Sequence, residues 1–205
     1  MIVNNVISLS NNRFKIEVEG SSTFALYKKE LDKYGLKVGS TITDSLWTEI
    51  KNDILLKRAK KRALHLLEKM NRSESNLRRK LREGFYPDDV IDQAISYVKS
   101  FGYINDDNYT KIFIESKMYR KSRKEIYQGL RQKGIDPESI KEALQRHYCD
   151  DVELEVIRSI IIKRKIDFNE ASKGDINKLY SYLARKGFSY DGIDKAIKEC
   201  NEGAL

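Results

Sequence analysis

One polar residue followed by two apolar residues at four-residue steps is a pattern that occurs three times in the chain. A glycine with a hydrophobic neighbour ends each copy. Residues four apart share one face of a helix, and glycine commonly stands just past a helix end. We therefore predict a capped helix in each copy. The three copies are Ser73, Leu77, Leu81, Gly84 and Phe85; Ser122, Ile126, Leu130, Gly134 and Ile135; and Asp175, Leu179, Leu183, Gly187 and Phe188.

A further helix is predicted after each glycine, because an aliphatic residue follows six positions later. In the second copy Asp136 is a typical N-cap and Pro137 suits the first helical position. The first copy is counted as one residue shorter between Leu81 and Gly84. The glycines are 50 and 53 residues apart, a spacing typical of tandem repeats. We predict a mainly α fold, a tandem array of three three-helix repeats in an elongated arrangement.

The first 43 residues follow a different pattern. Apolar and polar residues alternate strictly from Arg13 to Glu19, as in a half-buried strand, with apolar runs at residues 6–9 and 23–27. A small N-terminal β-meander is predicted, then a short helical segment at residues 29–34. A role in docking or capping the array is the default expectation for this segment.

Helical spacing returns at Thr43 or Asp44 and continues to Met70, which predicts one long helix. Further first helices are predicted at residues 107–120, with Ile112 turned inward, and at residues 151–166. The expected domains are a β-rich segment at 1–43, repeat 1 with the long first helix at 44–104, repeat 2 at 105–149 and repeat 3 at 150–205.

Positive charge is concentrated in the middle of the chain. The whole chain has a net charge of +8, and residues 57–135 hold 20 Lys and Arg against 10 Asp and Glu. Such a block is typical of a protein that binds a polyanion. A simple solvated helix surface is the alternative explanation. Arg123 and Lys124 stand where a helix should begin and cations are disfavoured, which suggests a binding partner.

No pattern of a catalytic, metal or cofactor site is found. The two histidines are not near a cysteine or each other, and no phosphate-binding loop occurs. Three Asp-Asp pairs stand at expected helix starts, so we interpret them as capping carboxylates and not as nuclease ligands. The two cysteines lack metal-site spacing and indicate a reduced, intracellular protein. Without a leader or membrane span in the sequence, we expect a cytoplasmic protein. We further expect a monomer without enzymatic activity.

Three segments at about residues 59–200 together resemble the RecX family, bacterial regulators of the RecA recombinase. They are NRSESNLRRKL at 71–81, FGYINDD at 101–107 and LRQKGI at 130–135. Two positions depart from the family pattern. Ser122 stands where the family usually has glycine, and the segment ending at Gly84 lacks the usual Lys-Gly pair.

The resemblance implies three-helix repeats that lie in the groove of the RecA–single-stranded-DNA filament and regulate it. Regulation there means mostly inhibition of recombinase, ATPase and repressor co-cleavage activities in DNA repair and the SOS response. RecA and the single-stranded DNA within its filament are then the expected partners, and no membrane is. We expect basic residues to make the contacts, namely Arg72, Arg78, Arg79, Arg82, Lys117, Arg120, Lys121, Arg123, Lys124, Arg131 and Lys133.

Two other functions stay open. Two short helices joined at a glycine also describe a helix-turn-helix, so a direct DNA-binding regulator is the main alternative. That alternative predicts sequence-specific duplex binding without RecA. An adaptor for some other acidic protein would instead bind without any nucleic acid.

Overall fold

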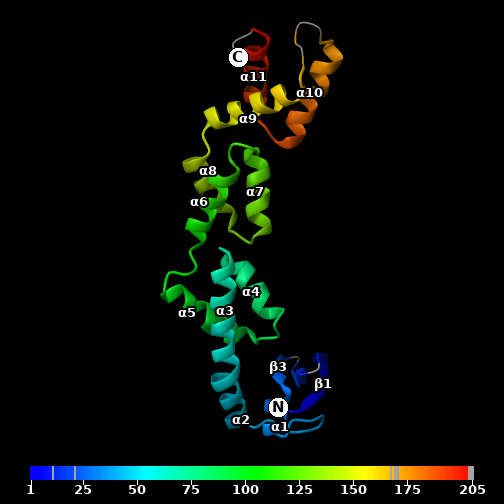
Figure 1. The fold of residues 1–205 in the computed structure, drawn as a ribbon, viewed down its shortest axis with the longest axis vertical. Helices are drawn as coiled ribbons and strands as arrows, with labels where there is room; N and C mark the ends of the chain where they lie inside the picture. The colour runs from blue at the N-terminus through cyan, green and yellow to red at the C-terminus, as the bar shows by residue number, and fades with distance from the viewer. Residues whose placement is uncertain (11, 21, 167, 169–170, 203–205) are drawn as a thin grey trace. The chain divides into compact units, whose positions relative to one another are not determined.

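The computed structural model describes residues 1–10, 12–20, 22–166, 168 and 171–202. It divides into two compact units, Met1–Asn105 and Asp106–Leu205 (Figure 1). The fold is mainly helical with a small N-terminal sheet, as predicted. Among the described residues, no helix is both long enough and apolar enough to cross a lipid bilayer.

Unit 1 begins with the predicted meander. Strands β1 (Val3–Ser10), β2 (Arg13–Val18) and β3 (Thr23–Tyr27) pair in antiparallel order, and helix α1 (Lys28–Lys33) follows directly. Alternation along β2 buries Ile16 and Val18 against the rest of the unit. The sheet is therefore one wall of the unit and has no core of its own.

The long helix of unit 1 is continuous, as predicted, but its backbone changes along its length. It consists of α2 (Asp44–Glu49), a π-helical segment η1 (Ile50–Leu56) and α3 (Lys57–Lys69). The Thr43 side chain caps its start by accepting a hydrogen bond from the Leu46 N–H. The expectation that Met70 belongs to the helix is wrong, because its backbone is extended and its side chain is exposed.

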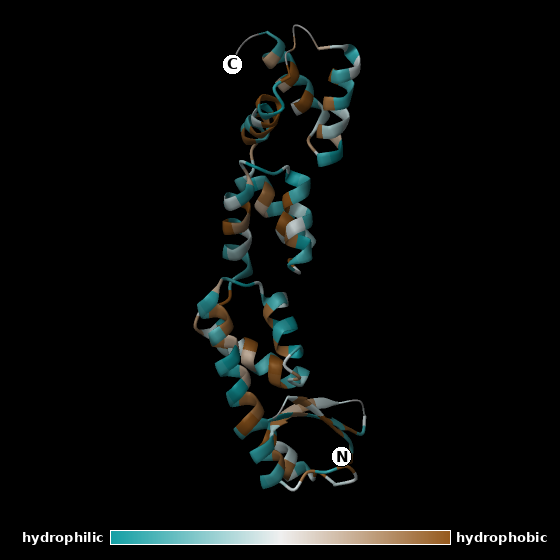
Figure 2. Cartoon of the chain, turned by 45° about the vertical axis from the view of Figure 1, so that its right-hand side comes forward, coloured by the Kyte–Doolittle hydropathy of each residue, from teal (hydrophilic) through white to brown (hydrophobic). Residues whose placement is uncertain are grey.

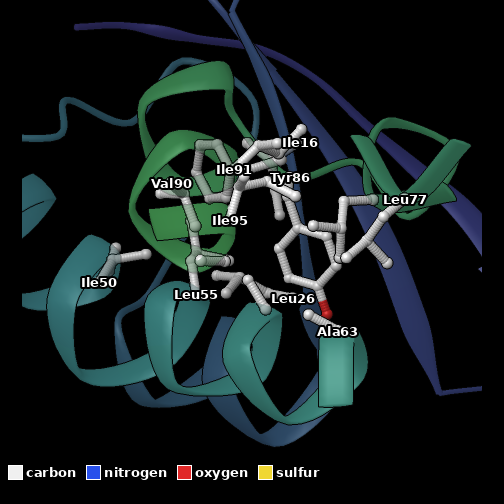
Figure 3. Packing of buried hydrophobic residues seen from close by; sticks show 14 of the residues in the cluster. Ile16, Leu26, Ile50, Leu55, Ala63, Leu77, Tyr86, Val90, Ile91 and Ile95 are labelled. Carbon is white, nitrogen blue, oxygen red and sulfur yellow. The ribbon is translucent and has the colours of Figure 1, made fainter. Parts of the chain in front are cut away.

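Helices α4 (Glu74–Arg82) and α5 (Asp88–Ser100) complete unit 1. Figure 3 shows the core that they share with the sheet and the long helix. Ile16 and Leu26 from the sheet meet Leu55 from η1, Leu77 from α4 and Ile95 from α5 in this cluster. The N-terminal segment and the first repeat therefore fold around one hydrophobic core.

The end of α4 corrects the predicted register of the first repeat. Phe85, not Gly84, holds the left-handed backbone conformation, with φ of 59° against 78° at Gly134. The Tyr86 N–H then donates to the Leu81 carbonyl, as the Ile135 N–H does to that of Leu130. The first repeat is thus not shortened, and Tyr86 is the buried hydrophobic residue after the left-handed residue, as Ile135 is in the second repeat.

Unit 2 contains two successive groups of three helices. The first group is α6 (Asp106–Lys117), α7 (Arg123–Gln132) and α8 (Pro137–His147), and the second is α9 (Asp150–Lys163), α10 (Lys173–Lys186) and α11 (Tyr190–Asn201). Both groups contribute to one buried cluster. Figure 2 shows hydrophobic and hydrophilic residues on each helix, as amphipathic helices require.

Most predicted helix starts of unit 2 are confirmed, and one is wrong. Ser122 and Glu125 form the predicted capping box, and Asp136 caps α8 with Pro137 in its first turn. Asp175, predicted as a cap, lies within α10. Ser172 caps that helix one turn earlier and also donates its hydroxyl to the Asp175 carboxylate.

Two predicted helix ends lie too late, and one side chain points outward. Helix α6 ends at Lys117, three residues before the predicted end, and in the turn that follows the N–H groups of Arg120 and Lys121 both donate to the Lys117 carbonyl. Helix α9 ends at Lys163 and not at residue 166. Ile112 is 42% exposed, because Ile114 occupies the inward position instead.

Candidate functional site

The four predicted contact arginines of unit 1 lie on or just before α4, and each has a partner within the unit. The Arg72 side chain donates to the Leu66 carbonyl and to the Asn76 side chain, which fastens the start of the helix. Arg78, Arg79 and Arg82 make ion pairs: Arg78 with Glu74 and Asp92, Arg79 with Glu83, and Arg82 with Asp88.

These ion pairs differ in how readily they exchange for another anion. More than half of each of the Arg79 and Arg82 side chains is exposed, whereas about a quarter of Arg78 is. Exposed pairs contribute about 0–1 kcal/mol, so a phosphate or carboxylate of a partner can replace them at little cost. Arg79 and Arg82 therefore suit a contact role better than Arg72 or Arg78.

The turn between α6 and α7 in unit 2 carries the most available cations among the predicted contacts. The Lys117 and Arg120 side chains are exposed and make no ion pair with any residue that the structure describes. Lys121 pairs with Glu125 at 3.3 Å. A pocket of about 280 Å³ lies beside the turn, with Lys117, Lys121, Gln128 and the Glu125 carboxylate in its wall. An anionic group could be held there by both lysines.

Arg123 has an internal partner that the sequence did not indicate. Its guanidinium donates to the Tyr148 carbonyl at 2.6 Å, lies 5.3 Å from the Tyr148 ring centroid and is 3.5 Å from the Asp150 carboxylate. Tyr148 is the C-cap of α8, where a cation is favoured. Arg123 therefore joins α7 to the end of α8, and this role explains its position without an external partner.

The other three predicted contacts of unit 2 lie at the two ends of α7. The Lys124 stem passes so close to Gly187 that a Cβ on that glycine would lie 2.5 Å from the Lys124 Cβ. Arg131 donates to the Ile135 carbonyl over a long 3.5 Å, and Lys133 is the exposed C-cap residue. The Lys124 stem thus contacts the third repeat while the residue stays exposed, and Arg131 and Lys133 also lie on the surface.

A half-buried carboxylate organises the charges around the start of α7. Glu125 accepts from the Ser122 N–H at 3.2 Å and lies 3.3 Å from Lys121 and 3.4 Å from Lys186. Burial works against its ionisation, but the Ser122 bond and the two lysines outweigh burial and lower the pKa of Glu125 below its usual value. This carboxylate is ionised at neutral pH and fixes the lysines in place.

Cations outside the predicted set also gather in unit 1. Lys61 and Arg62 on α3 lie with Arg13 of β2 in the wall of one pocket. The basic run at residues 57–62 is visible in the sequence. Arg13 is far from that run along the chain, so only the pairing of the folded strand with the α4–α5 turn could place it there.

No metal-binding group is present in the described part of the chain, where no three His, Cys, Asp or Glu side chains cluster suitably. The three Asp-Asp pairs lie in the first turns of α5, α6 and α9, where negative charge suits the helix dipole. The expectation that they are caps is wrong for α5 and α9, whose N-cap residues are Pro87 and Cys149. Cys149 and Cys200 are free thiols, and burial raises the pKa of Cys200.

Comparison with known proteins gives one consistent family. Residues 59–97 match the model of the RecX first three-helix domain, and residues 105–144 match that of the second. The chain is 32% identical over 199 residues to "Regulatory protein RecX" of Caldanaerobacter subterraneus subsp. tengcongensis, covering 96% of this chain and 98% of that protein. The protein of the same name from Clostridium acetobutylicum is 28% identical over 196 residues, covering 92% and 90%.

Solved structures agree with the fold. A crystal structure of regulatory protein RecX superimposes with a TM-score of 0.67 at 23% identity and covers 97% of this chain and 99% of its own. The crystal structure of RecX from Lactobacillus salivarius gives a TM-score of 0.64 at 29% identity, over 70% of this chain and 95% of its own. The match to the first of these crystal structures therefore includes both the β-rich segment and the repeats.

Proposed function

The chain belongs to the RecX family of regulatory proteins, and we propose that it regulates the RecA recombinase by binding RecA and its filament on single-stranded DNA. The observation that carries this proposal is the match to regulatory relatives over nearly the whole chain. The regulation is non-enzymatic and mostly inhibitory. It acts on the recombinase, ATPase and co-protease activities in DNA repair and the SOS response, and a cytoplasmic monomer performs it.

Exposed cations support this function, because the filament offers phosphates and carboxylates. Lys117 and Arg120 lie together at one turn of unit 2, and Lys121, Arg131 and Lys133 lie on the same pair of helices. We assign the principal contact to the α6–α7 turn, where the cations are least neutralised from within. Arg79 and Arg82 of unit 1 supply a second contact by exchanging their internal carboxylates.

The proposed division into a β-rich segment at 1–43 and repeats at 44–104, 105–149 and 150–205 fits this assignment. Repeat 1 then presents Arg79 and Arg82 near the end of its second helix, and repeat 2 presents Lys117 and Arg120 at the turn before its second helix. Repeat proteins use such serial surfaces to follow an extended partner.

The test is the single-stranded-DNA-dependent ATPase of RecA, with this protein titrated in at fixed moderate salt. The wild-type protein should inhibit at amounts well below one per RecA. The double variant Lys117→Glu with Arg120→Glu should need about tenfold more protein for half inhibition, since like charges then face the filament. Lys195→Glu with Lys198→Glu, on exposed positions of α11, is the matched control and should stay within about twofold.

Two results would contradict the proposal at different levels. Equal inhibition by both double variants would remove the α6–α7 turn from the contact surface and leave RecA as the target. Absence of inhibition by the wild-type protein, with complete coating of the DNA by RecA demonstrated, would remove RecA. Duplex binding in a gel-shift assay would then favour the helix-turn-helix alternative.

A further inference from the structure

A basic pocket of about 700 Å³ lies within unit 1, where β2 and α3 meet the turn between α4 and α5. Its wall contains five cationic side chains and one carboxylate: Arg13, Arg58, Lys61, Arg62, Lys80 and Glu83. A volume of this size is typical of small-molecule sites. A concave wall with one sign of charge concentrates ligands of the opposite sign.

Internal ion pairs neutralise only part of this charge. Glu30 pairs with Arg58, and Glu83 pairs with Lys80 at 2.6 Å. Among the residues that the structure describes, Arg13, Lys61 and Arg62 make no ion pair, although Arg13 donates to the Gly84 carbonyl. Three uncompensated cations around one cavity repel each other, and a bound anion would relieve that repulsion.

Tyr86 gives the pocket a donor that the fold itself does not use. The residue is only 8% exposed, yet its hydroxyl makes no hydrogen bond within the described part of the chain. The side chain lines the pocket, and Figure 3 shows its oxygen at the edge of the hydrophobic cluster, beside Ala63 of α3. Among the described residues, Thr110 has the one fully buried side-chain oxygen without a hydrogen-bond partner. The Tyr86 hydroxyl is therefore open to the cavity, where it can donate to a molecule that enters.

The protonation state of Tyr86 suits donation to an anion. Burial raises the pKa of the phenol above its ordinary value, although Arg58, Arg13 and Arg62 act in the opposite direction. The hydroxyl therefore keeps its proton at neutral pH. Arg13, Arg58 and Arg62 line the same pocket as this hydroxyl.

We propose that this pocket binds the phosphate groups of a small polyphosphate ligand such as a nucleotide, with Tyr86 as donor and Arg13, Lys61 and Arg62 as counter-charges. Guanidinium and phosphate pair through two parallel hydrogen bonds, which suits a site rich in arginine. The partly exposed Tyr27 ring also lines the pocket and offers a surface for an attached base. A site confined to one unit suits a small ligand better than it suits a strand of nucleic acid. This inference does not rest on the proposed action on RecA.

Isothermal titration calorimetry on the full chain tests the site, with inorganic tripolyphosphate as the probe. One molecule should bind per chain. Tyr86→Phe, which changes no charge, should weaken binding about tenfold, because a hydrogen bond to an anion is lost. Lys61→Gln and Arg62→Gln should each weaken it by a similar factor. Lys69→Gln, at the other end of α3 and outside the pocket, is the control and should bind as the wild type does.

Three further results decide the ligand and the proposal. Tighter binding of adenosine triphosphate than of tripolyphosphate would identify a nucleotide, and equal binding would identify inorganic polyphosphate. Failure of the probe to bind saturably, or equal binding by the wild type and Tyr86→Phe in proteins of equal unfolding midpoint, would overturn the site. The last result is displacement of the probe by a single-stranded oligothymidylate without terminal phosphates, with the same dependence on Tyr86. This result would show that the site binds a nucleic-acid backbone, and it would overturn the small-ligand proposal.

Discussion

The Ser122 hydroxyl donates a hydrogen bond to the carbonyl of Lys186, 64 residues further along the chain. The same oxygen accepts from the Glu125 N–H and so caps α7. One buried side chain therefore starts a helix of the second repeat and satisfies the last turn of a helix of the third.

Ser122→Ala should lower the free energy of unfolding more than loss of an ordinary cap. Loss of the cap costs about 1 kcal/mol, and the unpaired Lys186 carbonyl adds about 1 kcal/mol. Ser172→Ala is the matched control, because Ser172 caps α10 from an exposed position. Urea unfolding should rank the two variants, and equal losses would show that the Lys186 bond contributes nothing.

Gly187→Ala should destabilise the protein more than Gly102→Ala. Both glycines have a left-handed backbone, with φ of 88° and 70°, so each alanine costs about 1–2 kcal/mol. At Gly187 the new Cβ would also lie 2.5 Å from the Lys124 Cβ, whereas nothing lies within 4 Å at Gly102. Thermal unfolding should show that Gly187→Ala lowers the free energy of unfolding by about 1 kcal/mol more than Gly102→Ala does. Equal midpoints would mean that the Lys124 stem moves aside freely.

The stability of the protein should fall in acid partly through Glu125. Its pKa is lower in the folded chain than in the unfolded chain, so its contribution is complete above about pH 4.3 and is lost as the pH falls through the folded value. Between pH 6 and pH 3 the wild type should therefore lose roughly 1 kcal/mol more than Glu125→Gln. Glu138→Gln, at an exposed pair with Lys141, should follow the wild-type slope. Parallel curves for all three proteins would contradict the assignment.

Arg123→Lys separates a structural role from a contact role, because it keeps the charge and loses the planar guanidinium. We expect about 1 kcal/mol of lost stability, since lysine does not reproduce the bond to the Tyr148 carbonyl together with the stacking on its ring. Inhibition of RecA per folded molecule should not change. Arg131→Lys is the control. The hydrogen bond of Arg131 to the Ile135 carbonyl is weak at 3.5 Å, so this substitution should leave the stability of the protein unchanged. A large loss of inhibition by folded Arg123→Lys would assign that arginine to the filament contact.

Local signals in the sequence predict the helices well, because a cap acts within one turn. The capping box of Ser122 and Glu125 and the Asp136-Pro137 start are formed as expected. Phe85 shows the limit of such signals. The adjacent Gly84 is the better left-handed residue by its chemistry, yet Phe85 adopts that conformation and the next residue, Tyr86, is buried.

Contacts between distant residues account for what the sequence could not show of the site. Arg123 reaches Tyr148 25 residues away, and Arg13 reaches Gly84 71 residues away. A count of charges along the sequence treats the two residues of each pair as unrelated, and it places every arginine on the surface. The fold instead uses Arg123 internally and gathers Arg13 with Lys61 and Arg62, which lie in the basic run but attract no attention individually.

The π-helical segment Ile50–Leu56 gives the long helix one residue more than a regular α-helix of the same length would contain. Its wider turn holds one residue more than an α-helical turn, so deleting a single residue there would restore a regular helix. Trp47 before the segment and Ala59 after it would still face the core. We therefore expect family members whose long helix is one residue shorter to differ within this segment, with Lys61 and Arg62 still in the wall of the basic pocket.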